Sequence, residues 1–142
     1  MSPSLIGRIQ TRLVLLATVG LAWTIVIVPF LPKGGATLTT VYGTTLVALI
    51  MVGLAGVGWE FLYHAIQQYR WEKDWPTLFG LLVGIPEGIL AFVLVGSVVD
   101  DGPNLLTFTL HFASTWILLW LTAIGPLRMV LLRWRYQGGK IF

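Results

Sequence analysis

The chain has 142 residues, of which 56% are hydrophobic and only 11% charged, and its mean hydropathy is +0.84. A water-soluble domain carries about 25% charged residues, so this composition excludes one and indicates an integral membrane protein. The absence of cysteine excludes disulfides, iron–sulfur clusters, thiolate zinc sites and cysteine nucleophiles. The net charge is +3, and we interpret the basic residues as membrane topology signals rather than as a nucleic-acid surface.

Four apolar segments are each long enough to cross a bilayer, which takes about 20 residues. The predicted spans are residues 13–31, 41–66, 78–99 and 105–127. The first follows a basic start, but its apolar stretch is longer than that of a signal peptide and no small-residue cleavage site follows it, so we expect a span. Because the connections are short, we predict a single domain over residues 1–142, an all-α four-helix transmembrane bundle.

The distribution of positive charge predicts the orientation of this bundle. Four spans place both termini on one side of the membrane, together with the middle loop. That side has eight of the nine basic residues, and the opposite side has only Lys33. The positive-inside rule therefore predicts that both termini are cytoplasmic, in a cytoplasmic (inner) membrane.

The third span contains a carboxylate within the apolar sequence "LVGIPEGIL", residues 82–90. Glu87 follows Gly80 by seven positions, so helical geometry returns it to within about 20° of the glycine face. Since lipid exposure of a charge costs several kcal/mol, we expect Glu87 to face a packed neighbour, beside a kink at Pro86. Small residues let membrane helices approach closely, and the predicted packing glycines are Gly53, Gly80, Gly84 and Gly88.

Further ionisable and polar residues accompany Glu87 inside the spans. Glu60 and His64 are four residues apart and share a helix face, and His111 lies in the fourth span. If these faces converge, Glu60, His64, Glu87 and His111 form a graded polar ladder through the bilayer.

The ladder has several interpretations, which the sequence leaves open. It can hold helices or partner subunits together, or it can carry protons or cations. As a weaker alternative, Glu60, His64 and Glu87 are candidate metal ligands of a membrane enzyme; the identity of any metal is unknown. The two histidines differ in depth by about 14 Å, which argues against a haem held by both. We expect no cofactor.

The middle loop and the C-terminal tail combine aromatic and basic residues. We interpret them as membrane-interface anchors or partner-contact surfaces, formed by Arg70, Trp71, Lys73, Trp75, Arg133 and Arg135. No serine-hydrolase, phosphate-loop, zinc-protease or dinucleotide motif is present. We therefore expect a small non-enzymatic membrane subunit that assembles or stabilises a multi-component complex. Its partners would be the lipid bilayer and other membrane subunits or further copies of this chain, with no nucleic acid.

Overall fold

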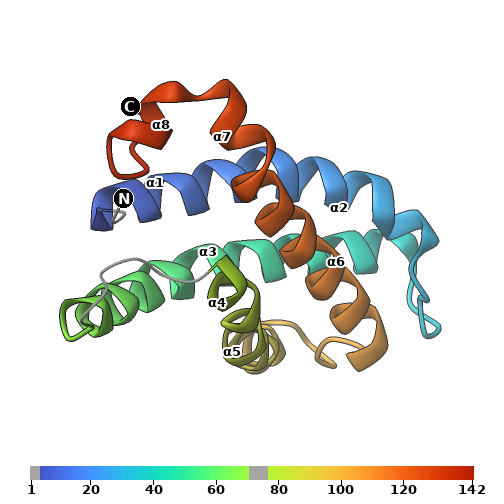
Figure 1. Ribbon diagram of the computed structural model, residues 1–142. Coiled ribbons are helices and arrows are strands. Elements are labelled where there is room, and N and C mark those ends of the chain that lie inside the picture. The colour runs from blue at the N-terminus through green and yellow to red at the C-terminus, as the bar shows by residue number, and fades with distance from the viewer. Residues whose placement is uncertain (1–3, 71–76) are drawn as a thin grey trace.

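The computed structural model describes residues 4–70 and 77–142. Within these residues the structure is helical, without strands, and four helical stretches are long and apolar enough to cross a membrane. They run Leu5–Phe30, Leu38–Gln68, Thr77–Val98 and Leu105–Val130. The all-helical architecture predicted from composition and hydropathy is therefore confirmed (Figure 1).

The first stretch begins earlier than hydropathy predicts. It comprises α1 (Leu5–Leu15), the π-helical turn η1 (Leu16–Gly20), α2 (Leu21–Ile27) and the 3-10 turn η2 (Val28–Phe30). Ser4 caps its start, because the serine hydroxyl accepts a hydrogen bond from the Gly7 N–H at 3.1 Å. The helix therefore includes Arg8 and Arg12, which precede the predicted span at residues 13–31.

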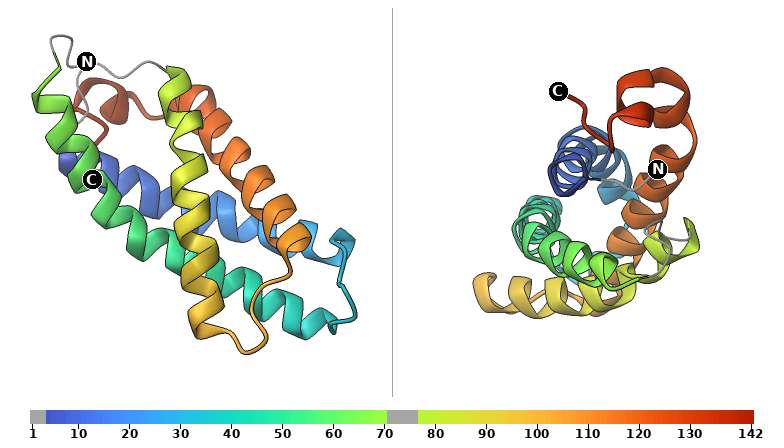
Figure 2. Two further views of the ribbon diagram at one scale, coloured as in Figure 1. Left: turned by 90° about the horizontal axis from the view of Figure 1, so that it is seen from below. Right: turned by 60° about the vertical axis from the view of Figure 1, so that its left-hand side comes forward.

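The second stretch is the single helix α3 (Leu38–Gln68), which lies alongside α1 and α2 in an antiparallel hairpin (Figure 1). The third is divided into α4 (Thr77–Leu82) and α5 (Gly84–Val98). The interruption falls at Val83, one turn before Pro86, where the proline ring crowds the Leu82 carbonyl. Helix α5 packs most extensively against α3, which it crosses obliquely (Figure 2).

The fourth stretch comprises α6 (Leu105–Ile124) and α7 (Pro126–Val130), and α8 (Leu132–Tyr136) follows. Asn104 caps α6 through the Thr107 N–H at 3.1 Å. An apolar core lies where the four stretches meet, and it is built around Leu16, Ala48, Val52, Ala91, Val95 and Phe108.

The C-terminal tail folds back onto α1. The Ser4 N–H donates to the Gly138 carbonyl at 2.8 Å, and the Trp134 indole donates to the Thr11 hydroxyl at 2.7 Å. A Cβ on Gly7 would lie 2.2 Å from the Gly138 oxygen, so only glycine permits this approach. Both ends of the described chain therefore lie at the same end of the bundle (Figures 1 and 2).

Candidate functional site

Arg12 lies between the two carboxylates that the sequence places inside apolar segments. Its Nε and Nη2 donate to Glu60 Oε1 at 2.9 and 2.6 Å. Its Nη1 and Nη2 donate to Glu87 Oε2 and Oε1 at 2.5 and 3.0 Å. The planar guanidinium thus engages both oxygens of Glu87, the bidentate geometry in which arginine binds carboxylates most strongly, and also one oxygen of Glu60. One side chain joins α1, α3 and α5.

Local sequence explains how Arg12 reaches this position. Gly56 lies one turn before Glu60 on the buried face of α3. A Cβ on Gly56 would lie 2.6 Å from Arg12 Nη1 and 2.7 Å from its Cδ, so the glycine provides space for the arginine side chain. By contrast, Gly53, predicted as a packing residue, has only an ordinary contact with Leu16 at 3.8 Å.

Two aromatic side chains complete the surroundings of Arg12 and Glu87. The Tyr63 hydroxyl donates to Glu87 Oε1 at 3.1 Å. The Arg12 guanidinium lies 5.6 Å from the Trp116 ring centroid, within the range of a cation–π interaction.

Arg8, one turn before Arg12, extends the cluster toward the end of the bundle where the chain termini lie. Its Nη1 is 3.8 Å from Glu60 Oε2, and its Nη2 donates to Gln67 Oε1 at 2.9 Å. We call Arg8, Arg12, Glu60 and Glu87 the arginine–glutamate cluster. Its two guanidinium groups and two carboxylates cancel in formal charge.

The cluster is well shielded. The exposed fraction of the side chain is 2% for Glu87, 10% for Glu60 and 11% for Arg12. Charges at this degree of burial persist only when they are paired and hydrogen-bonded, which is what the arrangement provides.

The structure gives the two predicted ladder histidines other partners. His111 is 2% exposed, and its Nε2 lies 2.8 Å from the Thr24 hydroxyl. That hydroxyl donates to the Gly20 carbonyl at 2.8 Å, so it accepts a hydrogen bond from His111 Nε2–H. His64 Nε2 lies 3.4 Å from the Gln68 side-chain nitrogen. Of the four ladder residues, the structure brings together Glu60 and Glu87.

The described residues do not provide the ligands that the predicted metal site requires. Residues 4–70 and 77–142 contain no group of three His, Asp or Glu side chains placed to hold a metal ion. The oxygens of Glu60 and Glu87 face Arg12 instead of converging with His64 on a common point.

The glycines of the third stretch contact aromatic side chains from α6. A Cβ on Gly84 would lie 2.4 Å from Trp116 Nε1, and one on Gly88 would lie 2.7 Å from Phe112. Gly80 lies nearest to Trp120, where an added Cβ would be 3.4 Å away. The glycine stripe therefore accommodates rings, rather than the backbone of a neighbouring helix.

The structure describes three of the six residues that were predicted to lie at the membrane interface or to contact a partner. Trp71, Lys73 and Trp75 lie outside the described residues. The Arg70 N–H donates to the Gln67 carbonyl at the end of α3, at 3.3 Å. On α8, Arg133 Nε donates to Gln137 Oε1 at 2.8 Å, and the Arg135 guanidinium lies 5.5 Å from the Tyr136 ring centroid.

Sequence reasoning missed Arg12, because it counted that residue only as a topology signal. Two observations indicate it in retrospect. Glu60 and Glu87 both lie within apolar segments and require a counter-charge. Arg8 and Arg12 are spaced by one helical turn directly before the first apolar segment, which places both guanidinium groups on one helix face.

Comparison of the chain with models of protein families, with curated proteins and with solved structures finds no match.

Proposed function

We propose that this chain is a non-enzymatic integral membrane subunit that assembles or stabilises a multi-component membrane complex. The observation that carries the proposal is the closed arginine–glutamate cluster. Its charged groups bind one another and join three of the four apolar stretches, so they serve to hold a membrane bundle in one arrangement.

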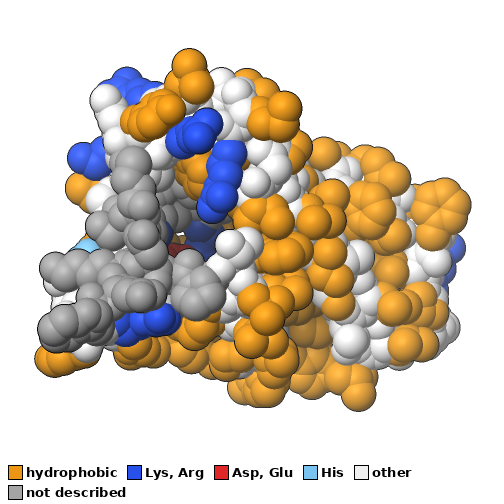
Figure 3. Space-filling model, viewed as in Figure 1, with side chains coloured by type: hydrophobic (Ala, Val, Ile, Leu, Met, Phe, Trp, Pro, Cys, Tyr) orange, Lys and Arg blue, Asp and Glu red, His pale blue; other side chains and the backbone are white. Residues whose placement is uncertain are grey.

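Membrane insertion is supported by the outer surface of the bundle. Large apolar side chains point outward along the stretches: Ile25 is 57% exposed, Leu54 67% and Ile89 64%. Figure 3 shows apolar side chains over most of the body of the molecule. Lys33 lies at the end opposite the termini, so the positive-inside rule favours cytoplasmic termini in a cytoplasmic membrane.

The cluster geometry favours assembly over proton or cation movement. A proton carrier must gain and lose its proton readily during each cycle. Protonating Glu87 here would remove the negative charge that its two contacts present to the Arg12 guanidinium and leave a positive charge only partly compensated inside the bundle. These carboxylates are therefore better suited to fixing helix positions than to carrying charge.

The proposal is tested by purification of the chain from its native membrane in mild detergent, followed by mass spectrometry of what co-elutes. We expect partner chains in stoichiometric amounts. A chain that elutes alone or only with copies of itself overturns the subunit proposal.

A pair of variants distinguishes assembly from transport. Glu87→Gln should lower the membrane abundance of the chain and of its partners together. Asp100→Asn, which removes one negative charge at an exposed site outside the cluster, should leave both unchanged. If Glu87→Gln instead leaves abundance and partners intact and abolishes a pH-dependent ion flux, the transport alternative is correct.

A further inference from the structure

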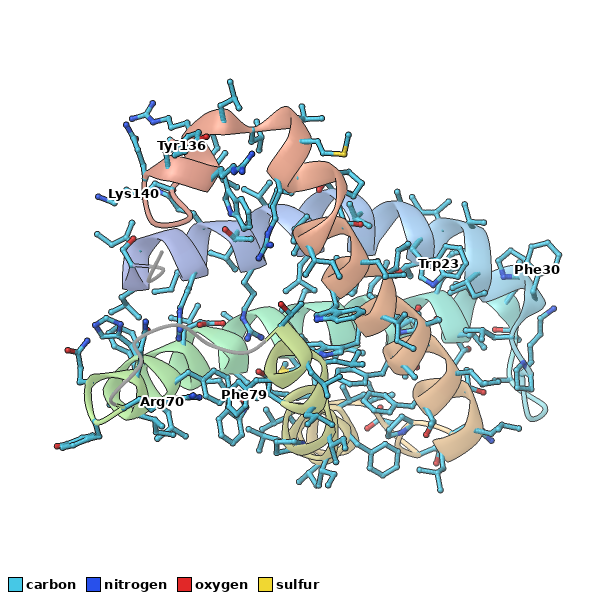
Figure 4. All side chains as sticks on the ribbon, viewed as in Figure 1. Trp23, Phe30, Arg70, Phe79, Tyr136 and Lys140 are labelled. Atoms are coloured by element: carbon cyan, nitrogen blue, oxygen red, sulfur yellow. The ribbon has the colours of Figure 1, made fainter. Side chains whose placement is uncertain are left out.

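A large cavity opens at the end of the bundle where the chain termini lie. Its volume is about 780 Å³, and its walls come from α1, α3, α4, α6, α7, α8 and the segment after α8. Figure 4 shows Tyr136 on α8 and Phe79 on α4 on opposite sides of this space, and both residues line it. The volume is within the range of about 300–1,000 Å³ that is typical of small-molecule sites.

The cavity lining is strongly basic. Arg8, Arg12, Arg128 and Arg135 line it. Because Glu60 and Glu87 compensate Arg8 and Arg12, the lining has a formal surplus of two positive charges, from Arg128 and Arg135. Neither Arg128 nor Arg135 has a carboxylate partner among the described residues. Figure 3 shows basic side chains around the hollow beneath the C-terminal helices. The lining is therefore complementary to an anion.

Tryptophan side chains form an apolar wall of the cavity on the side of the bundle interior. The indole N–H groups of Trp116 and Trp120 donate to the carbonyls of Gly80 and Thr77 at 3.2 and 2.9 Å. Because their polar edges are already bonded within the chain, these side chains present mainly apolar ring surface to a ligand. Tryptophan in this position is typical of a membrane–water interface.

A smaller recess of about 250 Å³ lies next to the cavity and shares part of its lining, including Arg12 and Glu60. It shares the walls formed by Trp116, Trp120 and Ala123 and adds apolar residues deeper in the bundle, including Leu15 and Leu119. A basic cavity next to a recess lined mainly by apolar side chains fits an amphipathic anion better than a small inorganic one.

We propose that this cavity binds one anionic phospholipid. Its phosphate contacts Arg128 and Arg135 at the mouth, and the start of an acyl chain lies against Trp120 and Leu119 in the recess. The cytoplasmic leaflet of a membrane is anionic, and basic pockets between helices on that side recognise such headgroups. This inference rests on the membrane placement proposed above, but not on the presence of a partner subunit.

The test is a titration of the purified chain, in uncharged detergent, with phosphatidylglycerol and with phosphatidylcholine, and bound lipid is counted by native mass spectrometry. We expect one phosphatidylglycerol per chain and much weaker phosphatidylcholine binding. Arg128→Gln and Arg135→Gln should each raise the dissociation constant for phosphatidylglycerol at least about tenfold, since each removes a charge-assisted hydrogen bond to phosphate.

Arg133→Gln is the matched control. Arg133 lies on α8 beside Arg135 and is also exposed, but it does not line the cavity. Its replacement should change the dissociation constant by less than about twofold, the effect of a screened surface charge. If Arg133→Gln weakens binding as much as Arg135→Gln does, the lipid is held by general surface charge and the proposed site is wrong.

A variant without a charge change tests the recess separately. Ala123→Leu adds volume to the wall that both cavities share, and we expect it to weaken phosphatidylglycerol binding while the arginines remain. Unchanged affinity in Ala123→Leu contradicts the placement of the acyl chain. This test remains valid if an arginine variant fails to fold, because Ala123→Leu leaves all four arginines in place.

Competition distinguishes the two sources of a phosphate group. Inorganic phosphate and glycerol phosphate should displace little phosphatidylglycerol, because they cannot occupy the recess. Effective displacement by either one assigns the cavity to a soluble phosphate and overturns the lipid proposal, as does preferential capture of an acidic peptide. Because this titration uses the isolated chain, its failure is distinguishable from a failure to find partner subunits in native membranes.

Discussion

Arg12→Met removes the one cation that contacts both Glu60 and Glu87, and replaces it with an apolar side chain of similar length. Four hydrogen bonds from Arg12 to the two carboxylates are lost. Glu87 retains the Tyr63 hydroxyl, and Glu60 retains Arg8 at 3.8 Å. Two carboxylates then face each other without the cation that separated them.

Two magnitudes compete in this variant. Ordinary interhelical hydrogen bonds in membranes contribute only about 0.6 kcal/mol each. Removing one partner of a buried ion pair costs about 3–5 kcal/mol, because it leaves an uncompensated buried charge. The side chain of Glu87 is only 2% exposed and does not line the cavity, so its charge is buried and the larger magnitude, that of a broken ion pair, applies. We expect a loss of about 3–5 kcal/mol in the free energy of unfolding.

Equilibrium unfolding in mixed micelles of mild detergent and dodecyl sulfate measures this loss. The seven tryptophans provide the fluorescence signal. The matched control is Arg133→Met, the same replacement at an exposed arginine, which should change the free energy of unfolding by less than about 0.5 kcal/mol. The triple variant Arg12→Met, Glu60→Gln, Glu87→Gln should recover at least half of the loss, because it leaves no unpaired carboxylate.

A loss below about 1 kcal/mol in Arg12→Met refutes this reasoning, since that is the size of a single hydrogen bond rather than of a broken buried ion pair. A triple variant no more stable than Arg12→Met also refutes it. In that case the hydrogen bonds themselves, rather than the unpaired charges, account for the effect.

Three further predictions concern packing, a buried hydrogen bond and orientation. Gly84→Ala should destabilise the bundle by about 1–3 kcal/mol in the same unfolding assay, because its Cβ would overlap the Trp116 indole. The control Gly58→Ala has open space around its Cβ and should stabilise α3. Equal effects of the two replacements would contradict the close contact between Gly84 and the Trp116 ring. Thr24→Val leaves His111 buried without its hydroxyl partner and should lower the free energy of unfolding by about 1–3 kcal/mol. The control Thr18→Val, at an exposed threonine that bonds only within its own helical segment, should lower it little. Equal unfolding midpoints of the two variants would show that the Thr24–His111 bond contributes nothing. In this cysteine-free chain, an impermeant maleimide should label Lys33→Cys in intact cells and Gln137→Cys only after permeabilisation; the reverse pattern would place the termini outside.

Hydropathy located the helices well because each is a long apolar block between polar connections. The predicted second and fourth spans are residues 41–66 and 105–127, and the corresponding stretches run Leu38–Gln68 and Leu105–Val130. The first helical stretch begins at Leu5, before the predicted span at residue 13, since hydropathy falls where charges occur. Helical hydrogen bonding continues through Arg8 and Arg12 as far as the Ser4 cap, because buried carboxylates compensate these charges.

The site was only partly predictable. Helical periodicity shows which residues share a face of one helix, so it placed Glu87 with the glycines. It does not show which face of another helix lies opposite, and thus neither the Arg12 contact nor the Thr24–His111 pair could be read from spacing. The return of the tail onto α1 depends on the absence of a side chain at Gly7, a signal that no hydropathy pattern contains.

The arginine–glutamate cluster also imposes an order on biosynthesis. Arg12 is made first, and its partners Glu60 and Glu87 follow 48 and 75 residues later. At a synthesis rate of about 5–20 residues per second, Arg12 is without Glu87 for about 4–15 seconds. Until Glu60 has been made, Arg12 lacks both carboxylate partners, so we expect the first helix not to enter an apolar environment alone. The cluster is complete only after α5 has been made, so we expect the first three stretches to pack together as a group.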